Sequence, residues 1–156
     1  MENSTVGLDE TVVVELSEKL NDLLANYQVF YQNLRGFHWN IKGRDFFELH
    51  AKFEELYNEA ALTIDAIAER VLTLDHIPVH SYSNYVSVSE IEESTNITKG
   101  SECVAIIHAN VRILLKKEKS ILKLADTASD HGTSDLMTQQ ISVQEKLNWM
   151  LSSYLA

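Results

Sequence analysis

The sequence contains little of what interrupts helices or cross-links chains. It has five glycines, a single proline and a single cysteine among 156 residues. With apolar residues recurring mainly at helical spacing, this scarcity predicts an all-α chain. The lone Cys103 cannot pair within its own chain, which argues against a disulfide-based secreted fold and fits a reducing cytoplasm. Thiol catalysis by Cys103 stays open, although its apolar neighbours favour a small buried side chain.

Long apolar runs and basic termini are also missing. No stretch supplies the roughly 20 apolar residues that cross a bilayer. The acidic start, Met1 to Glu10, lacks the basic and apolar regions of a signal peptide, so a cytoplasmic location is expected. The formal net charge of −10 repels nucleic acid and anionic membranes but attracts metal cations.

The apolar periodicity predicts four long helices in a single domain, 1–156. They are expected at about Asp9 to His38, Asp45 to Asp75, Ser101 to Asp126, and Ser134 to Leu155. A capping box formed by Asp45 and Glu48 is expected to open the second helix. A break around Gly132 is expected to separate the last two, and Tyr154 is expected to face the core.

Residues 76–100 have a different composition, rich in serine and asparagine and including the only proline. A connection this long is unusual in a compact domain unless it crosses the length of a bundle. A short helix is expected within it at Ser89–Thr95, because Ser89 can cap it and three glutamates suit its positive N-terminal end. The predicted fold is a four-helix bundle with one long crossover, which by itself names no function.

Two histidines and two acids have metal-binding character: His38, His50, Asp65 and Glu69. Asp65 and Glu69 are four positions apart and project from one helix face, and Glu54 follows His50 at the same spacing. Imidazole with carboxylate suits iron and other first-row divalent metals. On spacing alone, a solvated helix face for the acids and ordinary packing roles for the histidines remain alternatives.

Helix geometry restricts how these residues can act together. His50 and Asp65 are 15 positions apart, which is about 22 Å along an α-helix. They cannot share one metal within a single chain. If two copies of the second helix pack antiparallel about a two-fold axis, the histidine end of each lies beside the acidic end of the other, and two equivalent sites result.

The residues around these positions form a distinctive set. It comprises Phe37-His38-Trp39-Asn40, Gly43, Asp45-Phe46-Phe47, Leu49-His50, Phe53-Glu54-Glu55-Leu56-Tyr57, Asp65, Ala68-Glu69-Arg70, Glu145-Lys146 and Trp149-Met150-Leu151. Steps of 12, 15 and 4 residues separate the two histidines, the aspartate and the glutamate. The set resembles the signature of the Dps mini-ferritins, the family of DNA protection during starvation, and spans nearly the whole chain.

The resemblance implies a ferritin-like fold and a homo-oligomeric shell of twelve subunits. It implies a ferroxidase that oxidises Fe(II), typically with hydrogen peroxide, stores the ferric mineral in its cavity and so protects against oxidative damage. By position, the residues implied as iron ligands are His38, His50, Asp65 and Glu69, with Glu54 as a further acid. Trp39 matches the tryptophan beside that centre, and packing at a subunit interface is its alternative.

The resemblance also implies acidic pores through which iron enters the shell. Asp126, Asp130 and Asp135 lie in the corresponding segment between the last two helices. His131 falls where some relatives have an acid. A solvated loop is the alternative for this segment.

Three other functions are alternatives to this one. Family members that bind DNA generally use basic tails, but Met1–Ser4 and Ser152–Ala156 contain no basic residue, so strong DNA binding is not expected. A conventional ferritin centre uses Glu-x-x-His pairs, and no histidine here has a glutamate three residues before it. A structural bundle with a coincidental ligand spacing is the remaining alternative.

Overall fold

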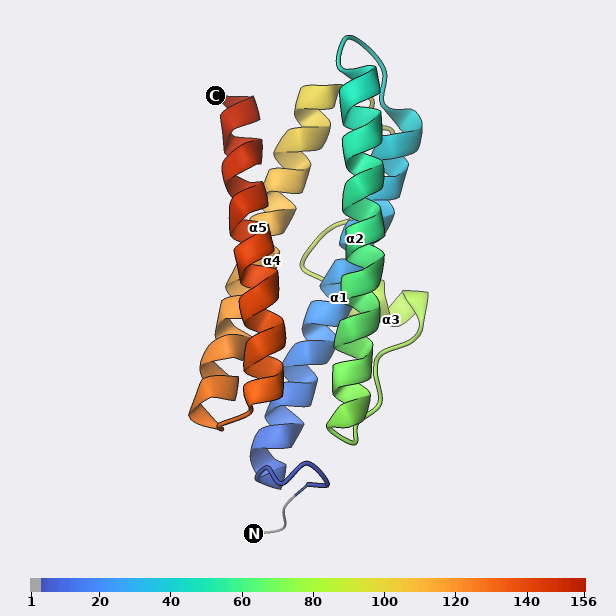
Figure 1. Cartoon of the computed structure of the whole chain (residues 1–156). Coiled ribbons are helices and arrows are strands. Elements are labelled where there is room, and N and C mark those ends of the chain that lie inside the picture. Colours follow the sequence, from blue (N-terminus) through green and yellow to red (C-terminus); the bar gives the residue numbers. More distant parts are fainter. Residues whose placement is uncertain (1–3) are drawn as a thin grey trace.

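The computed structural model describes residues 4–156, so most of the N-terminal tail considered above, Met1–Asn3, lies outside the described residues. The helices are α1 (Glu10–Asn40), α2 (Phe46–Thr73), α3 (Tyr82–Val88), α4 (Gly100–Thr127) and α5 (His131–Leu155). The four long helices form a bundle, and the connection carrying α3 runs back along it to the start of α4 (Figure 1). The predicted all-α bundle with a long crossover is confirmed. Within residues 4–156, no helix is long and apolar enough to cross a membrane.

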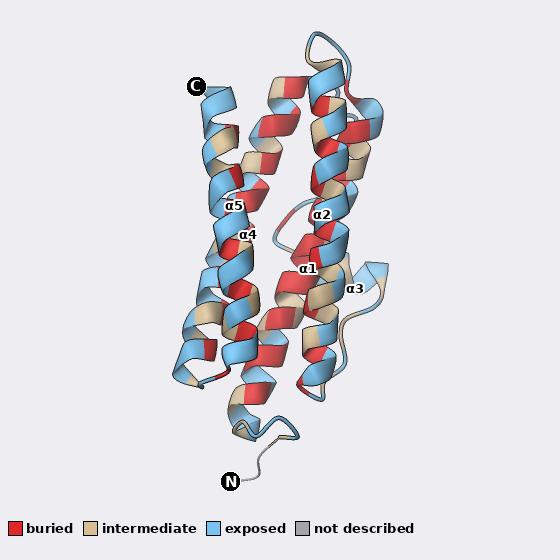
Figure 2. Ribbon diagram, in the orientation of Figure 1, coloured by how far each residue is buried: buried red, intermediate tan, exposed pale blue. Residues whose placement is uncertain are grey.

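Helix α1 is central to the core, since it packs against α2, α3 and α4. Its inward face is buried along almost its whole length (Figure 2). The buried positions include all those with the predicted helical spacing: Val13, Leu16, Leu20, Leu23, Tyr27, Phe30 and Leu34. Burial of each such large side chain contributes roughly 1.5–3 kcal/mol, which makes α1 the support on which α2 is positioned.

The start of α2 differs from the predicted capping box. Asp45 is the N-cap residue, but its side chain makes no capping hydrogen bond. Its carboxylate instead accepts a hydrogen bond of 2.7 Å from the Tyr154 hydroxyl. The prediction that Tyr154 faces the core was also wrong, because its side chain lies at the surface, 42% exposed. The Asp45 carboxylate therefore binds the hydroxyl of the distant Tyr154 and not the backbone N–H groups of α2, which the local pattern had predicted.

The short helix of the crossover lies earlier than predicted. Helix α3 ends where the sequence pattern predicted a helix to begin, and Ser89 is its C-cap residue. The buried Asn26 side chain accepts hydrogen bonds from the backbone N–H groups of Glu90 and Ile91, at 3.0 and 3.1 Å. This anchoring from α1 holds residues 89–91 outside a helix and overrides the local capping signal.

The break before α5 is also earlier than predicted, at residues 128–130. Ser129 adopts a positive φ of 57° there, and Gly132 lies within the first turn of α5. A Cβ atom at Gly132 would lie 2.5 Å from Nη1 of Arg70. This glycine thus leaves room for the Arg70 guanidinium and does not mark the helix break.

Candidate metal centre

His38 and His50 face each other across the short turn that joins α1 to α2. The Nδ1 atom of His38 lies 2.6 Å from the carbonyl oxygen of His50, and the Nδ1 atom of His50 lies 2.7 Å from the carbonyl oxygen of His38. A carbonyl oxygen only accepts hydrogen bonds, so each Nδ1 carries the donated hydrogen. In the neutral rings, Nε2 then keeps the lone pair that binds a metal.

Aromatic contacts hold the two imidazoles in place. The His38 and His50 rings stack with centroids 3.8 Å apart and planes 10° apart. Phe46 stacks on His50 at 4.9 Å, and the edge of Tyr57 meets His38 at 5.4 Å. Sequence reasoning missed Phe46 and Tyr57 as supporting residues, although Phe46 lies one helical turn before His50. The pair is therefore oriented before any metal binds.

The three acids of the predicted centre lie on the exposed side of α2. Glu54, Asp65 and Glu69 are all exposed. No hydrogen bond or ion pair within residues 4–156 engages their carboxylates, which leaves the oxygens free to bind cations. Asp65 and Glu69 lie toward the end of α2 distant from His50, about 22 Å and about 28 Å away along the helix.

One chain therefore brings together only part of the predicted ligand set. His38 and His50 meet, whereas Asp65 and Glu69 lie far from them on the same helix. In the part of the chain that the structure describes, no group of three or more His, Cys, Asp or Glu side chains could hold a metal ion. A complete centre from these residues requires a second copy of the chain.

Large apolar side chains accompany the acids on the outer surface of α2. Phe47 is 83% exposed, Leu62 is 75% exposed and Leu72 is 56% exposed. They lie near the start, the middle and the end of the helix, respectively. No other part of the described chain covers these apolar side chains or pairs with the acids between them.

Trp39 directly follows His38 at the end of α1 and is 57% exposed. The guanidinium of Arg35 lies 4.8 Å from the centroid of its ring and 5.3 Å from that of Tyr31. These cation–π contacts orient the indole at the surface. The two roles predicted for Trp39, beside the centre and at an interface, stay predictions.

The acids predicted to line a pore have different surroundings. Asp130 is 3% exposed, pairs with Arg70 at 2.6 Å and caps α5 by accepting from the Thr133 N–H. Asp126 and Asp135 are exposed, and they accept hydrogen bonds from Ser134 and Gln139. Asp130 therefore has a structural role in the chain, while the other two carboxylates face solvent.

Comparisons with known proteins agree with this architecture. The model of a family described as Ferritin-like domain matches residues 17–156. A crystal structure of a Dps protein from Vibrio cholerae O1 matches this chain with a TM-score of 0.98 and 49% identity, covering 100% of this chain and 98% of that one. That protein is described as a member of a broad superfamily of ferritin-like diiron-carboxylate proteins. The DNA protection during starvation protein of Porphyromonas gingivalis is 42% identical over 95% of this chain and 93% of its own length.

A second solved structure, a Dps protein from Bacillus brevis, gives a TM-score of 0.90 at 35% identity and covers 94% of this chain and 98% of that one. The bundle and the matched domain define a ferritin-like protein. Within that class, the chain belongs to the Dps family.

Proposed function

We propose that this protein is a ferroxidase that oxidises Fe(II) at centres shared between two subunits and stores the ferric product inside a dodecameric shell. The observation that carries the proposal is the histidine pair, in which both Nδ1 atoms are tied to backbone carbonyls and both Nε2 atoms are left for a metal. Two findings favour iron as the metal. The chain belongs to the Dps family, and its Vibrio cholerae relative is described as a member of a superfamily of ferritin-like diiron-carboxylate proteins.

The outer surface of α2 supports a particular register between two subunits. In an antiparallel pair of helices related by a two-fold axis, residues equidistant from the helix midpoint lie at the same level. With the midpoint between Glu59 and Ala60, one register pairs apolar with apolar, histidine with acid, and acid with acid. The pairs are Phe47 with Leu72, His50 with Glu69, and Glu54 with Asp65.

This register would complete the ligand set at both ends of the interface. His38, His50 and Glu54 of one copy would meet Asp65 and Glu69 of the other, and the two-fold axis would generate the same site again. The imidazoles supply neutral nitrogen ligands, and the carboxylates supply negative oxygen ligands that favour Fe(III) over Fe(II). The apolar pairs at the ends would exclude water from the rim.

The proposed reaction takes iron as its substrate. Two Fe(II) ions each give up one electron, and one hydrogen peroxide accepts both electrons with two protons, yielding two Fe(III) ions and two water molecules. Because both electrons reach one peroxide, no hydroxyl radical is released. The protein contributes ligands, electrostatics and exclusion of solvent, and the redox chemistry belongs to iron and peroxide.

Two further parts of the proposal concern location and partners. The single cysteine, Cys103, is fully buried, and burial raises the pKa of its thiol to about 11. Such an unreactive thiol fits a cytoplasmic protein without disulfides. Strong DNA binding is not expected, because the two tails carry no basic residue.

The proposal is tested by adding Fe(II) and hydrogen peroxide anaerobically and following ferric absorbance. His50→Ala should slow ferric formation by at least about tenfold, since it removes a direct ligand. His108→Ala is the matched control, because His108 lies on α4 outside the proposed centre and should leave the rate unchanged. Undiminished ferric formation by His50→Ala would overturn the assignment.

A further inference from the structure

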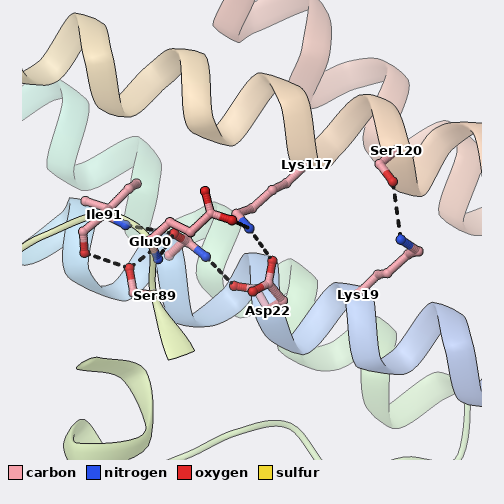
Figure 3. A network of polar contacts seen from close by, with 8 residues as sticks. Lys19, Asp22, Ser89, Glu90, Ile91, Lys117 and Ser120 are labelled. Atoms are coloured by element: carbon pink, nitrogen blue, oxygen red, sulfur yellow. Dashed lines mark hydrogen bonds and ion pairs between the residues drawn. The ribbon is translucent and has the colours of Figure 1, made fainter. Parts of the chain in front are cut away.

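A groove of about 730 Å³ lies between α1 and α4, beside the crossover. Its walls carry four cationic side chains and two acidic ones (Figure 3 shows part of this set): Lys19, Arg112, Lys116, Lys117, Asp22 and Glu90. No lining residue comes from α2 or α5. The groove is therefore separate from the candidate metal centre.

The two acids of the groove are engaged by a single lysine. Lys117 is 15% exposed and binds Asp22 at 2.7 Å and Glu90 at 2.9 Å. Burial alone would lower the pKa of Lys117, but the hydrogen bonds and charges of these two acids outweigh it and raise that pKa. Lys117, Asp22 and Glu90 thus form an ion-paired triad within the groove, and both carboxylates are already bound to a lysine.

The other three cations lack such partners. Lys19 donates to the neutral Ser120 hydroxyl at 3.3 Å. Within residues 4–156, no ion pair engages Arg112 or Lys116. The pKa of Glu90 is lowered chiefly by its hydrogen bond with Lys117, and the charge of Lys116 adds to this effect. Lys116 itself forms no ion pair with the Glu90 carboxylate.

The sequence of α4 leaves Arg112 and Lys116 without local compensation. Arg112 and Lys116 are four positions apart on one helix face, so their charges repel. Neither has an acid three or four positions away along the helix. In a chain with 23 acidic and 13 basic side chains, these two uncompensated cations and the nearby Lys19 produce a local positive field suited to an anion.

We propose that this groove binds a small multivalent phosphate anion, of the class of inorganic polyphosphates and nucleoside triphosphates. Arg112 offers a fork that matches two phosphate oxygens, and Lys19 and Lys116 add point charges from the opposite walls. Ser120 accepts from Lys19 and still has its own hydroxyl hydrogen to donate. A compact ligand fits better than duplex nucleic acid, because the net charge of −10 repels an extended polyanion that reaches beyond the groove.

The proposal is tested by calorimetric titration of the assembled protein with inorganic tripolyphosphate at physiological ionic strength. The double variant Arg112→Gln with Lys116→Gln should weaken binding by about tenfold or more. The matched control, Lys119→Gln with Lys123→Gln, removes the same charge from the same helix outside the groove and should change Kd by less than about twofold. Lys19→Gln, on the opposite wall, should also weaken binding.

Two results would overturn the proposal. The first is failure of the unmodified protein to bind tripolyphosphate, or equal weakening in the groove and control variants. The second is tighter binding of a DNA duplex than of tripolyphosphate, with the duplex lost in the groove variant, which would make the ligand a nucleic acid. The proposal does not rest on the ferroxidase function, so ferric formation should be the same in all these variants.

Discussion

The imidazoles of His38 and His50 are held by each other's backbone. Each Nδ1–H donates to the carbonyl oxygen of the other histidine, and the stacked rings fill the space between α1 and α2. A metal ligand supported in this way needs little reorganisation when the metal arrives, because its tautomer and orientation are already set. The acids have no comparable support within one chain, which is consistent with ligands completed by a partner.

Glu118 is a second residue whose surroundings have consequences. It is fully buried, it accepts a hydrogen bond of 2.6 Å from the Tyr27 hydroxyl, and its Oε2 atom has no partner within the described residues. Burial raises the pKa of its carboxyl group to about 7, against the opposing effect of the Tyr27 hydrogen bond. The folded chain therefore keeps a proton that the unfolded chain releases near pH 4.5.

This difference makes stability fall as the pH rises. Between about pH 4.5 and 7 the folded state binds more protons at Glu118, so the free energy of unfolding should decrease by about 3 kcal/mol over that window. Glu118→Gln removes the titration, and its melting temperature relative to the parent should rise by several degrees from pH 5 to pH 8. Thermal melts at the two pH values check this. The exposed Glu15→Gln serves as control, and a constant Glu118→Gln difference would contradict the account.

Gly132 and Gly36 allow a matched test of close packing. Gly132→Ala should displace the Arg70 guanidinium and weaken its ion pair with the buried Asp130, lowering stability by about 1–3 kcal/mol. Gly36 has no atom within 4 Å of an added Cβ, so Gly36→Ala should stabilise α1 by up to about 1 kcal/mol. Opposite shifts in melting temperature are expected, and similar shifts in the two variants would refute this reading of Gly132.

At the scale of helices, the sequence predicted the features that depend on local periodicity. The four long helices and the buried face of α1 follow from apolar residues three and four positions apart. The capping box and the short helix were wrong, because Tyr154 and Asn26 reach these segments from distant parts of the chain. Such long-range hydrogen bonds leave no trace in a local pattern.

For the candidate centre too, the sequence predicted the residue types but not the long-range contacts around them. Spacing and family resemblance predicted the ligand types and a centre shared by two subunits, and this assignment stays a prediction. The reciprocal backbone bonds of His38 and His50 could not be predicted, because they depend on the turn that brings α1 against α2. Nor did the sequence show that Asp130 is buried against Arg70 while Asp126 and Asp135 stay exposed.

The exposed side of α2 yields a prediction about assembly. Leu62, which is 75% exposed, lies near the proposed two-fold axis, so Leu62→Arg places like charges close together in a paired α2. Particle mass should fall and ferric formation should be lost, while circular dichroism still reports the helices. Val14→Arg, on the exposed side of α1, should leave the mass unchanged. An intact Leu62→Arg particle would contradict the proposed interface.

At the scale of the whole molecule, the proposed activity belongs to the assembly and not to the folded chain. In the proposed centre, one subunit would supply the tethered histidines and another Asp65 and Glu69, because no group of three metal-binding side chains forms within residues 4–156. Folding and activity should therefore be separable. A variant that folds but does not pair is expected to retain its helices and lose ferroxidation.

The measurement that tests the shared centre most directly is ferroxidation by particles assembled from two inactive variants. His38→Ala and Asp65→Ala should each abolish ferric formation when expressed alone. Co-expressed in equal amounts, they should recover about a quarter of the parent rate, since half of the subunit pairs are mixed and one of the two centres in each mixed pair keeps every ligand. A mixture no more active than the single variants, or full activity in either variant alone, would contradict the shared centre.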